Sequence, residues 1–240
     1  DYDKFKGSLS VGLINSGLSI ELPLKLFDES SFIIGARRTS YDLMLGLFLK
    51  EPGIVFPYYY DVQGNISVKN GSDAFKLSWL YSYEKLNITV SNSQNIFVPG
   101  MSFSSLYNIR SPAISFQWSH KENDVSYCEI KAGWEKQDIR MNWDAKAKVI
   151  DNSTDITDPD HEYTETFNYD NSITIDKIQF KPVYHYLPSS QHIEAGLEMQ
   201  YYPRTKQTYD YTRKYFYSNG KSYGGNIYEY TGGAGLYSAF

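Results

Sequence analysis

The sequence predicts an all-β fold: an antiparallel meander of about ten strands forming all or part of a transmembrane outer-membrane β-barrel. Three observations predict it. Apolar and polar residues alternate along much of the chain, as the two faces of a strand require. Short turns alternate with long polar connections, as at the two rims of such a barrel. Aromatic residues make up 17% of the chain and include 23 tyrosines, and tyrosine and tryptophan concentrate at membrane interfaces.

Composition argues against several other classes of protein. The net charge is -5 at pH 7, whereas a nucleic-acid-binding protein usually carries a basic surface. The mean hydropathy is -0.48, and the longest apolar run, Leu43–Leu49, is far shorter than the roughly 20 residues of a transmembrane helix. The single cysteine, Cys128, excludes an internal disulfide framework.

Alternation and turn residues define the predicted strands. The hairpin at 57–86 is the clearest, because an Asn70-Gly71-Ser72-Asp73 turn separates two strands whose apolar residues fall at every second position. The ten strands are predicted near residues 7–14, 18–26, 31–41, 57–69, 74–86, 108–120, 125–148, 173–186, 192–203 and 227–240. The long connections are predicted at about 84–106, 150–166 and 209–226.

Two strands have features of their own. Residues 128–149 contain no Gly/Pro turn cluster, so the strand at 125–148 far exceeds the ~10 residues that cross a bilayer. We expect it to project above the membrane. In the strand at 173–186, the apolar residues of 173–175 are out of phase with those of 178–180, which predicts a β-bulge at Asp176–Lys177.

Several stretches carry a family resemblance: Gly7–Ile14 with Leu18–Pro23, Ser31–Leu43, Pro57–Gly64, and Gln191–Glu198 with Tyr201–Pro203. In order and spacing they resemble the barrel region of TonB-dependent receptors, in particular the Bacteroidetes-type group, just after the plug domain. Ser31–Leu43 is the most specific. The resemblance implies that 1–240 is a single β-barrel region, a fragment lacking the plug domain and the C-terminal strands of a barrel of about 22 strands.

The resemblance also implies a function and partners. The parent would be an outer-membrane receptor for energy-coupled uptake of a nutrient of the siderophore, carbohydrate or peptide class. Its partners would be the lipid bilayer, the plug domain, TonB and a surface lipoprotein, with no nucleic acid. No cofactor or enzymatic activity is expected, because phosphate-loop, His-Glu-x-x-His and Gly-x-Ser-x-Gly motifs are missing. Two alternatives stay open: a complete small passive barrel, porin-like or adhesin-like, and a soluble β-sandwich binding module.

Candidate ligand-binding residues come from the polar side of the predicted strands, which would face the lumen. They are Tyr59, Asp61, Gln63, Asn65, Glu194, Glu198 and Gln200. Aromatic residues of the predicted long loops would lie above them and suit capture of a ligand by stacking. These are Tyr107, Tyr163, Tyr209, Tyr211, Tyr215 and Tyr217. No catalytic or metal-binding residue is predicted.

Other charged and titratable residues are expected to be structural. His120 and His192 flank short turns and should be exposed, and His185 should face the lumen. Arg37 and Arg38 are adjacent and should point to opposite faces. One of them must then sit at the interface, because an arginine facing lipid at mid-depth costs roughly 2–4 kcal/mol. An acidic loop without EF-hand spacing is expected to be solvated: Asp151, Asp155, Asp158, Asp160, His161 and Glu162.

Overall fold

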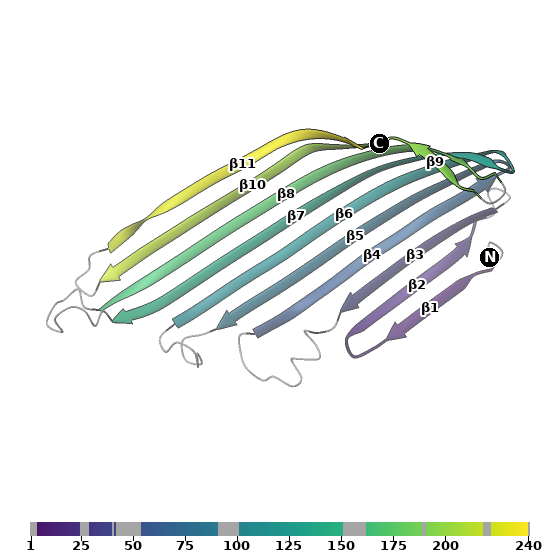
Figure 1. Cartoon of the computed structure of the whole chain (residues 1–240). Helices are drawn as coiled ribbons and strands as arrows, with labels where there is room; N and C mark the ends of the chain where they lie inside the picture. The colour runs from purple at the N-terminus through teal and green to yellow at the C-terminus, as the bar shows by residue number, and fades with distance from the viewer. Residues whose placement is uncertain are drawn as a thin grey trace.

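A computed structural model describes residues 4–24, 29–39, 41, 54–90, 101–150, 162–188, 191–217 and 222–239. They form one antiparallel sheet that does not close, in which ten strands follow one another in chain order (Figure 1). The ten are β1 (Lys6–Val11), β2 (Asn15–Pro23), β3 (Glu29–Thr39), β4 (Ile54–Asn70), β5 (Asp73–Val90), β6 (Met101–Asn123), β7 (Ser126–Ile150), β8 (Glu162–Tyr186), β10 (Glu198–Tyr217) and β11 (Ser222–Ala239). A short β9 (Ile193–Gly196) also pairs with β8. The predicted antiparallel meander is confirmed.

Short turns join the strands at one end of the sheet, which we call the turn end. Gly71 connects β4 to β5 with a φ of +59°, a left-handed conformation that glycine adopts without strain. Asp124 and Val125 connect β6 to β7, and the Val125 N–H donates a 2.9 Å hydrogen bond to Asn123 Oδ1. Turns this short set the register of each hairpin.

The strands run further from the turn end than the sequence predicts. β5 continues to Val90 and β6 begins at Met101, so much of the predicted loop 84–106 is strand. The predicted loops 150–166 and 209–226 are shortened in the same way. The predicted contrast between short turns and long connections therefore holds for the connections at 40–53, 91–100 and 151–161. It is wrong for those at 12–14 and 218–221, which are short although they lie at the end opposite to the turn end.

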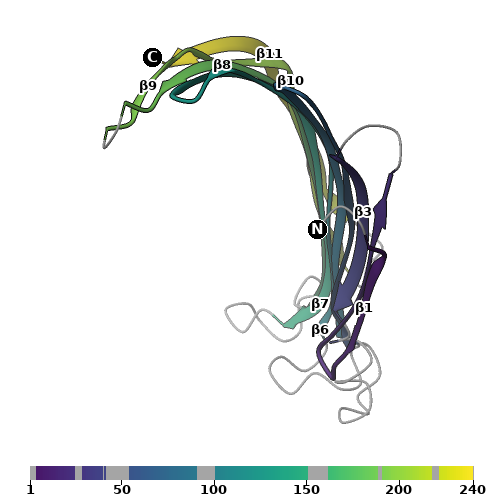
Figure 2. The same ribbon diagram turned by 90° about the vertical axis from the view of Figure 1, so that its right-hand side faces the viewer.

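The sheet is curved (Figure 2). Its two faces differ in polarity. Cross-strand partners share a face. One paired row is largely apolar: Phe32, Ile66, Leu77, Phe116, Ala132 and Phe180. The adjacent row lies on the other face and is more polar: Ile33, Asn65, Ser78, Ser115, Gly133 and Gln179. This second row lines a hollow that reaches from β2 to β8, so it belongs to the concave face and the apolar row to the convex face.

On β5, β6, β7 and β8 the alternation changes phase about midway along the strand. On β8 the convex face carries Ile178 near the turn end but Thr174 further out, and Ile175 lies on the concave face. The half of the sheet beyond this change is called the far half. Its convex face is polar, with Lys85, Asn87, Asn108, Arg140, Asn142, Asp144, Asn168 and Asp170 among its residues.

The bulge predicted at Asp176–Lys177 is wrong. β8 pairs with β7 without a register shift along its whole length. The extra residue lies instead in β10, between Tyr201 and Arg204, opposite this part of β8. A one-residue change of phase in a sequence can mark either a bulge or an exchange of polarity between the two faces. Only the pairing of neighbouring strands distinguishes the two.

The predicted strand at 192–203 is interrupted at Leu197. The Leu197 N–H donates a 3.1 Å hydrogen bond to the Pro182 carbonyl oxygen, but proline has no N–H to return. β9 and β10 are therefore separate strands, although both keep the same register against β8 on either side of the break.

The described residues build no second layer and no dry apolar core. Val183 is their only buried hydrophobic side chain, whereas buried polar residues include Asp61 and Glu129. On the convex face, Ile114 and Phe116 remain 45% and 41% exposed. A β-sandwich needs a second sheet, which this part of the chain does not form. Over the same residues, no helix has the length and apolar character needed to cross a membrane.

We expect Gly64→Ala to lower the free energy of unfolding by about 1–3 kcal/mol by overpacking the sheet. An added Cβ at Gly64 would overlap the Trp79 indole and lie 2.7 Å from the Ile33 carbonyl oxygen. Gly133→Ala is the matched control, because its nearest neighbour, the Ile114 carbonyl oxygen, would be 3.5 Å away. Urea titration measures the free energy of unfolding of both variants. Equal losses of stability in Gly64→Ala and Gly133→Ala would contradict the packing argument.

Candidate functional site on the concave face

The concave face carries a hollow of about 510 Å³ at the middle of the sheet, lined by both polar and apolar residues. Its polar lining includes Gln63, Asn65, Ser78, Glu135, Lys177 and Gln179. Lys177 Nζ lies 3.6 Å from the Glu135 carboxylate, and both side chains are partly exposed. Amides, a hydroxyl and an ion pair around an open hollow can bind a hydrated polar ligand by hydrogen bonds.

The register places all the predicted lumen residues on the concave face: Tyr59, Asp61, Gln63, Asn65, Glu194, Glu198 and Gln200. They do not form one site. Gln63 and Asn65 line the hollow. Tyr59 and Asp61 lie further from the turn end on β4, while the other three belong to β9 and β10. Ligand binding by these residues stays a prediction.

Asp61 is the most deeply buried of these residues, at 1% exposure. The pairing of β3 with β4 sets Arg37 directly opposite, and Arg37 Nε donates a hydrogen bond to the Asp61 carboxylate. The Arg37 guanidinium also lies 5.6 Å from the Tyr59 ring centroid. Arg38 is on the convex face, 5.7 Å from the Tyr58 ring centroid. The prediction that the two arginines point to opposite faces is confirmed.

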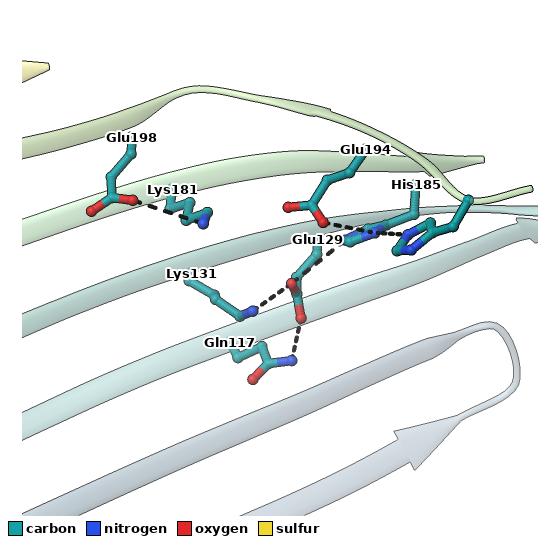
Figure 3. A network of polar contacts seen from close by, with 8 residues as sticks. Gln117, Glu129, Lys131, Lys181, His185, Glu194 and Glu198 are labelled. Carbon is teal, nitrogen blue, oxygen red and sulfur yellow. Dashed lines mark hydrogen bonds and ion pairs between the residues drawn. The ribbon is translucent and has the colours of Figure 1, made fainter. Parts of the chain in front are cut away.

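A second polar group surrounds Glu198, whose ion pair with Lys181 is drawn in Figure 3. Gln179 Nε2 and Gln200 Nε2 donate hydrogen bonds of 2.8 and 2.6 Å to Glu198 Oε1. Lys181 Nζ lies 3.7 Å from Glu198 Oε2, and the Tyr202 hydroxyl donates a 3.1 Å hydrogen bond to Gln200 Oε1. These side chains hold one another in place, so a ligand would meet a preformed polar surface.

Glu194 belongs to a cluster at the turn end that sequence reasoning missed. His185, predicted to face an open lumen, is only 7% exposed, and its Nδ1 lies 3.1 Å from His192 Nε2. His192 is exposed, as predicted. His120 pairs elsewhere, with its Nδ1 2.9 Å from Asp73 Oδ1. The sequence contained a signal for this cluster, because the turn predicted after β8 places the residues that precede it opposite the residues that follow it.

The far half of the concave face is aromatic. The ring centroids of Trp143 and Tyr169 are 5.6 Å apart, those of Tyr169 and Tyr209 6.1 Å, and those of Phe167 and Tyr211 5.2 Å. We call this surface the aromatic wall: Trp143, Tyr163, Phe167, Tyr169, Tyr209, Tyr211 and Tyr215.

The prediction that the far tyrosines lie on loops is wrong. Tyr107, Tyr163, Tyr209, Tyr211, Tyr215 and Tyr217 are all strand residues. Beyond the change of phase the apolar residues lie on the other face, so a search for alternation along one apolar face did not detect these parts of the strands. The acidic loop from Asp151 to His161 lies outside the described residues, and Glu162 begins β8.

Comparisons of this chain with protein-family models, with curated proteins and with solved structures found no match.

Proposed function

We propose that the chain forms part of the wall of an outer-membrane β-barrel that belongs to a nutrient receptor similar to the TonB-dependent receptors. One observation supports the membrane assignment above all: exposed apolar side chains form a band on the convex face. The band comprises the exposed Leu77, Ile114, Phe116, Ile178 and Phe180 on β5, β6 and β8, together with the half-buried Val62 and Ile66 on β4. A contiguous exposed apolar surface marks contact with lipid or with another protein.

The height of the band suits a bilayer. On β8, apolar or aromatic residues occupy the convex face from Ile178 to Tyr186, and Asp176 follows on the same face. A transmembrane β-strand needs about 9–11 residues at a tilt of about 45°. The nine residues 178–186 meet the lower end of that range. The band ends at the same level on the neighbouring β7, where Trp134 stands opposite Ile178 and Lys136 opposite Asp176. A partner protein would not require this common level.

Aromatic residues border the band on the side of the far half. On the convex face, the ring centroids of Tyr60 and Tyr83 are 5.3 Å apart, and those of Tyr58 and Tyr83 5.9 Å. The Arg110 guanidinium lies 5.7 Å from the Tyr83 ring centroid. Tyrosine and arginine together suit a membrane–water interface, because each has an apolar body and a polar tip.

A second aromatic border lies at the turn end. Trp118 Nε1 donates a 2.9 Å hydrogen bond to Asp73 Oδ1, and the Tyr184 hydroxyl donates a 3.2 Å hydrogen bond to Glu122 Oε2. These residues also lie on the convex face. An apolar band between two aromatic borders is the outer surface of membrane β-barrels.

Beyond the band, the convex face has the properties of a surface in water. Asp138 receives hydrogen bonds from Lys136 Nζ at 3.0 Å and from Thr174 Oγ1 at 2.8 Å. Burial alone would raise the pKa of Asp138, but these hydrogen bonds outweigh it and lower that pKa below its ordinary value. An ionised carboxylate here fits strands that project from the membrane.

The receptor function rests on the sequence resemblance, and the concave face is compatible with it. The hollow, with its polar and apolar lining, lies behind the apolar band, and the aromatic wall lies further out on the concave face. Aromatic rings can stack on sugars or on the side chains of peptides. Uptake would also need the plug domain, TonB and a surface lipoprotein, which the resemblance places elsewhere in the parent assembly.

A small passive barrel would have the same apolar band as a large receptor, but its sheet would have to close with the strands of this chain. β1 and β11 each have one unpaired edge in the described sheet, and open edges are unfavourable in lipid. Further strands would pair with both edges in a large receptor. Sequencing the complete reading frame separates the two: a plug upstream and more strands downstream favour the receptor, and their absence favours the passive barrel.

Spin labels test the membrane assignment on the complete protein in phospholipid vesicles. In a Cys128→Ser background, Ile114→Cys carries the label on the convex face and Ala113→Cys carries it on the concave face. We expect oxygen, which concentrates in lipid, to relax the label at 114, and a water-soluble nickel chelate to relax the label at 113. Equal access of the chelate to both labels would contradict the proposal.

A further inference from the structure

The β8–β9 hairpin gathers three metal-ligating side chains at the turn end. His185 is the penultimate residue of β8, His192 directly precedes β9, and Glu194 pairs with His185 across the two strands. His185 Nδ1 lies 3.1 Å from His192 Nε2 and 4.0 Å from Glu194 Oε2. The three ligand atoms all lie within 4.8 Å of one another. They come from both sides of one turn, so a single ion can bridge them.

The buried ring nitrogen of His185 gives an independent indication. Its side chain is 8% exposed, the Tyr127 ring stacks on it at a centroid distance of 4.2 Å, and Nε2 is buried without a hydrogen-bond partner. The nearest carboxylate oxygen, Glu129 Oε2, lies 3.8 Å from this nitrogen. An unsatisfied buried ring nitrogen is costly, so its retention beside a carboxylate needs a physical reason.

Glu129 is held so that it faces His185 (Figure 3). Its side chain is 10% exposed, Lys131 Nζ lies 2.7 Å from Oε2, and Gln117 Nε2 donates a hydrogen bond to Oε1. These contacts fix the position of the carboxylate. Glu129 is therefore suited to accept a hydrogen bond from the Nε2–H of His185 after a small approach.

The positions of the protons on His185 and His192 relate the close pair of ring nitrogens to the contact with Glu129. If Nδ1 of His185 donates to His192, then Nε2 of His185 has no proton and two acceptors, Nε2 and the Glu129 carboxylate, face each other. If His192 Nε2 donates to His185 Nδ1 instead, the proton of His185 sits on Nε2 and faces Glu129. A cation between Nδ1 of His185 and Nε2 of His192 imposes this same proton position on His185. Both facing nitrogens then supply lone pairs, and the proton of His185 sits on Nε2, directed at Glu129. Metal-binding histidines usually donate their second N–H to a carboxylate in this way.

We propose that His185, His192 and Glu194 bind a divalent transition-metal ion of the zinc type, with Glu129 orienting His185 from the outer shell. Two imidazoles and a carboxylate suit zinc, copper or nickel better than calcium or magnesium. Bonds of about 2.0–2.1 Å in a tetrahedral site set ligands about 3.3 Å apart. The two nitrogens are already near this separation, and the Glu194 side chain, 48% exposed, is free to approach.

The ion would join a weak part of the sheet. β9 has only four residues, and the break at Leu197 opposite Pro182 separates it from β10. A metal ion coordinated by residues of β8, β9 and the chain before β9 would hold this hairpin closed. This role does not depend on whether the convex face contacts lipid.

Cobalt(II) and zinc(II) binding to the complete protein, purified without a polyhistidine tag, tests the site. We expect one equivalent of cobalt to produce the visible d–d bands of a tetrahedral site, and zinc to displace it. His192→Ala should weaken zinc binding at least about 100-fold, since it removes an exposed ligand without disturbing the buried ones. His120→Ala, a histidine at the same end of the sheet that faces Asp73, is the matched control and should bind as the unmodified protein does.

Glu129→Gln tests the outer-shell role separately. It should weaken zinc binding by about 10–100-fold and leave the cobalt bands in place, the usual effect of removing such a partner. The absence of cobalt bands in the unmodified protein, or equal zinc affinities of the His192→Ala and His120→Ala variants, would overturn the metal site. Unchanged affinity in Glu129→Gln would overturn the outer-shell role of Glu129.

Discussion

Phe116→Arg is expected to lower the free energy of unfolding in phospholipid vesicles by about 2–4 kcal/mol, the cost of an arginine facing lipid near the bilayer midplane. Phe116 lies within the apolar band, on the central strand β6, and is 41% exposed. If the convex face met water, replacing a half-exposed phenylalanine would change stability by only about 0.5 kcal/mol. The sign and size of the effect therefore separate lipid from water.

Ser104→Arg is the matched control for this substitution. Ser104 lies on the same strand and the same face, but in the far half, where its cross-strand partners are Thr89 and Asp144. An arginine there should be neutral or slightly stabilising, because it faces water and a carboxylate. Urea titration of both variants in vesicles measures the difference. A loss for Ser104→Arg as large as that for Phe116→Arg would remove the basis for placing the membrane boundary between the two positions.

Arg37→Ala is expected to lower the free energy of unfolding by about 3 kcal/mol. The Asp61 side chain is fully buried, and its Oδ1 already has no hydrogen-bond partner. Removing the arginine leaves a buried carboxylate without a countercharge, which typically costs 3–5 kcal/mol. The lower end of that range applies because the Arg37 side chain is 63% exposed, so water can partly replace the guanidinium.

A second substitution checks the reason for this loss. Asp61→Asn in the Arg37→Ala background should recover a large part of the stability, since it removes the buried charge that the first substitution left unpaired. Arg38→Ala is the matched control, because Arg38 is exposed on the opposite face, and we expect it to cost about 1 kcal/mol or less. Urea titration of the four variants that make up the Arg37–Asp61 cycle provides the comparison. Similar losses for Arg37→Ala and Arg38→Ala would show that burial of Asp61 is not the cause.

The position of Asp61 illustrates how far sequence reasoning reaches. Alternation along β4 was enough to predict that Tyr59, Asp61, Gln63 and Asn65 share a face, and the register confirms it. The partner of Asp61 could not be predicted in the same way. Arg37 comes from the preceding strand, across the connection at 40–53, and nothing local in the sequence fixes which residues of β3 and β4 stand opposite each other.

The far half shows where apolar–polar alternation in the sequence led to wrong predictions. Leu86 and Ile88 belong to β5, but they lie on the concave face, whereas Leu77 and Trp79 lie on the convex face. A search for one continuous apolar face therefore ended the strand too early. The same change of phase in β8 was taken for a bulge, although the strand is regular there.

Period-two alternation and turn residues are properties of neighbouring positions, so the sequence by itself determined the antiparallel meander, the turn at Gly71 and the face on which each candidate residue lies. The tertiary structure alone decided which strands extend into the far half and which side chains meet across them. Glu129, His185 and Glu194 come from three different strands, and their meeting depends on cross-strand register. Register is a relation between segments far apart in the chain, and no single segment contains it.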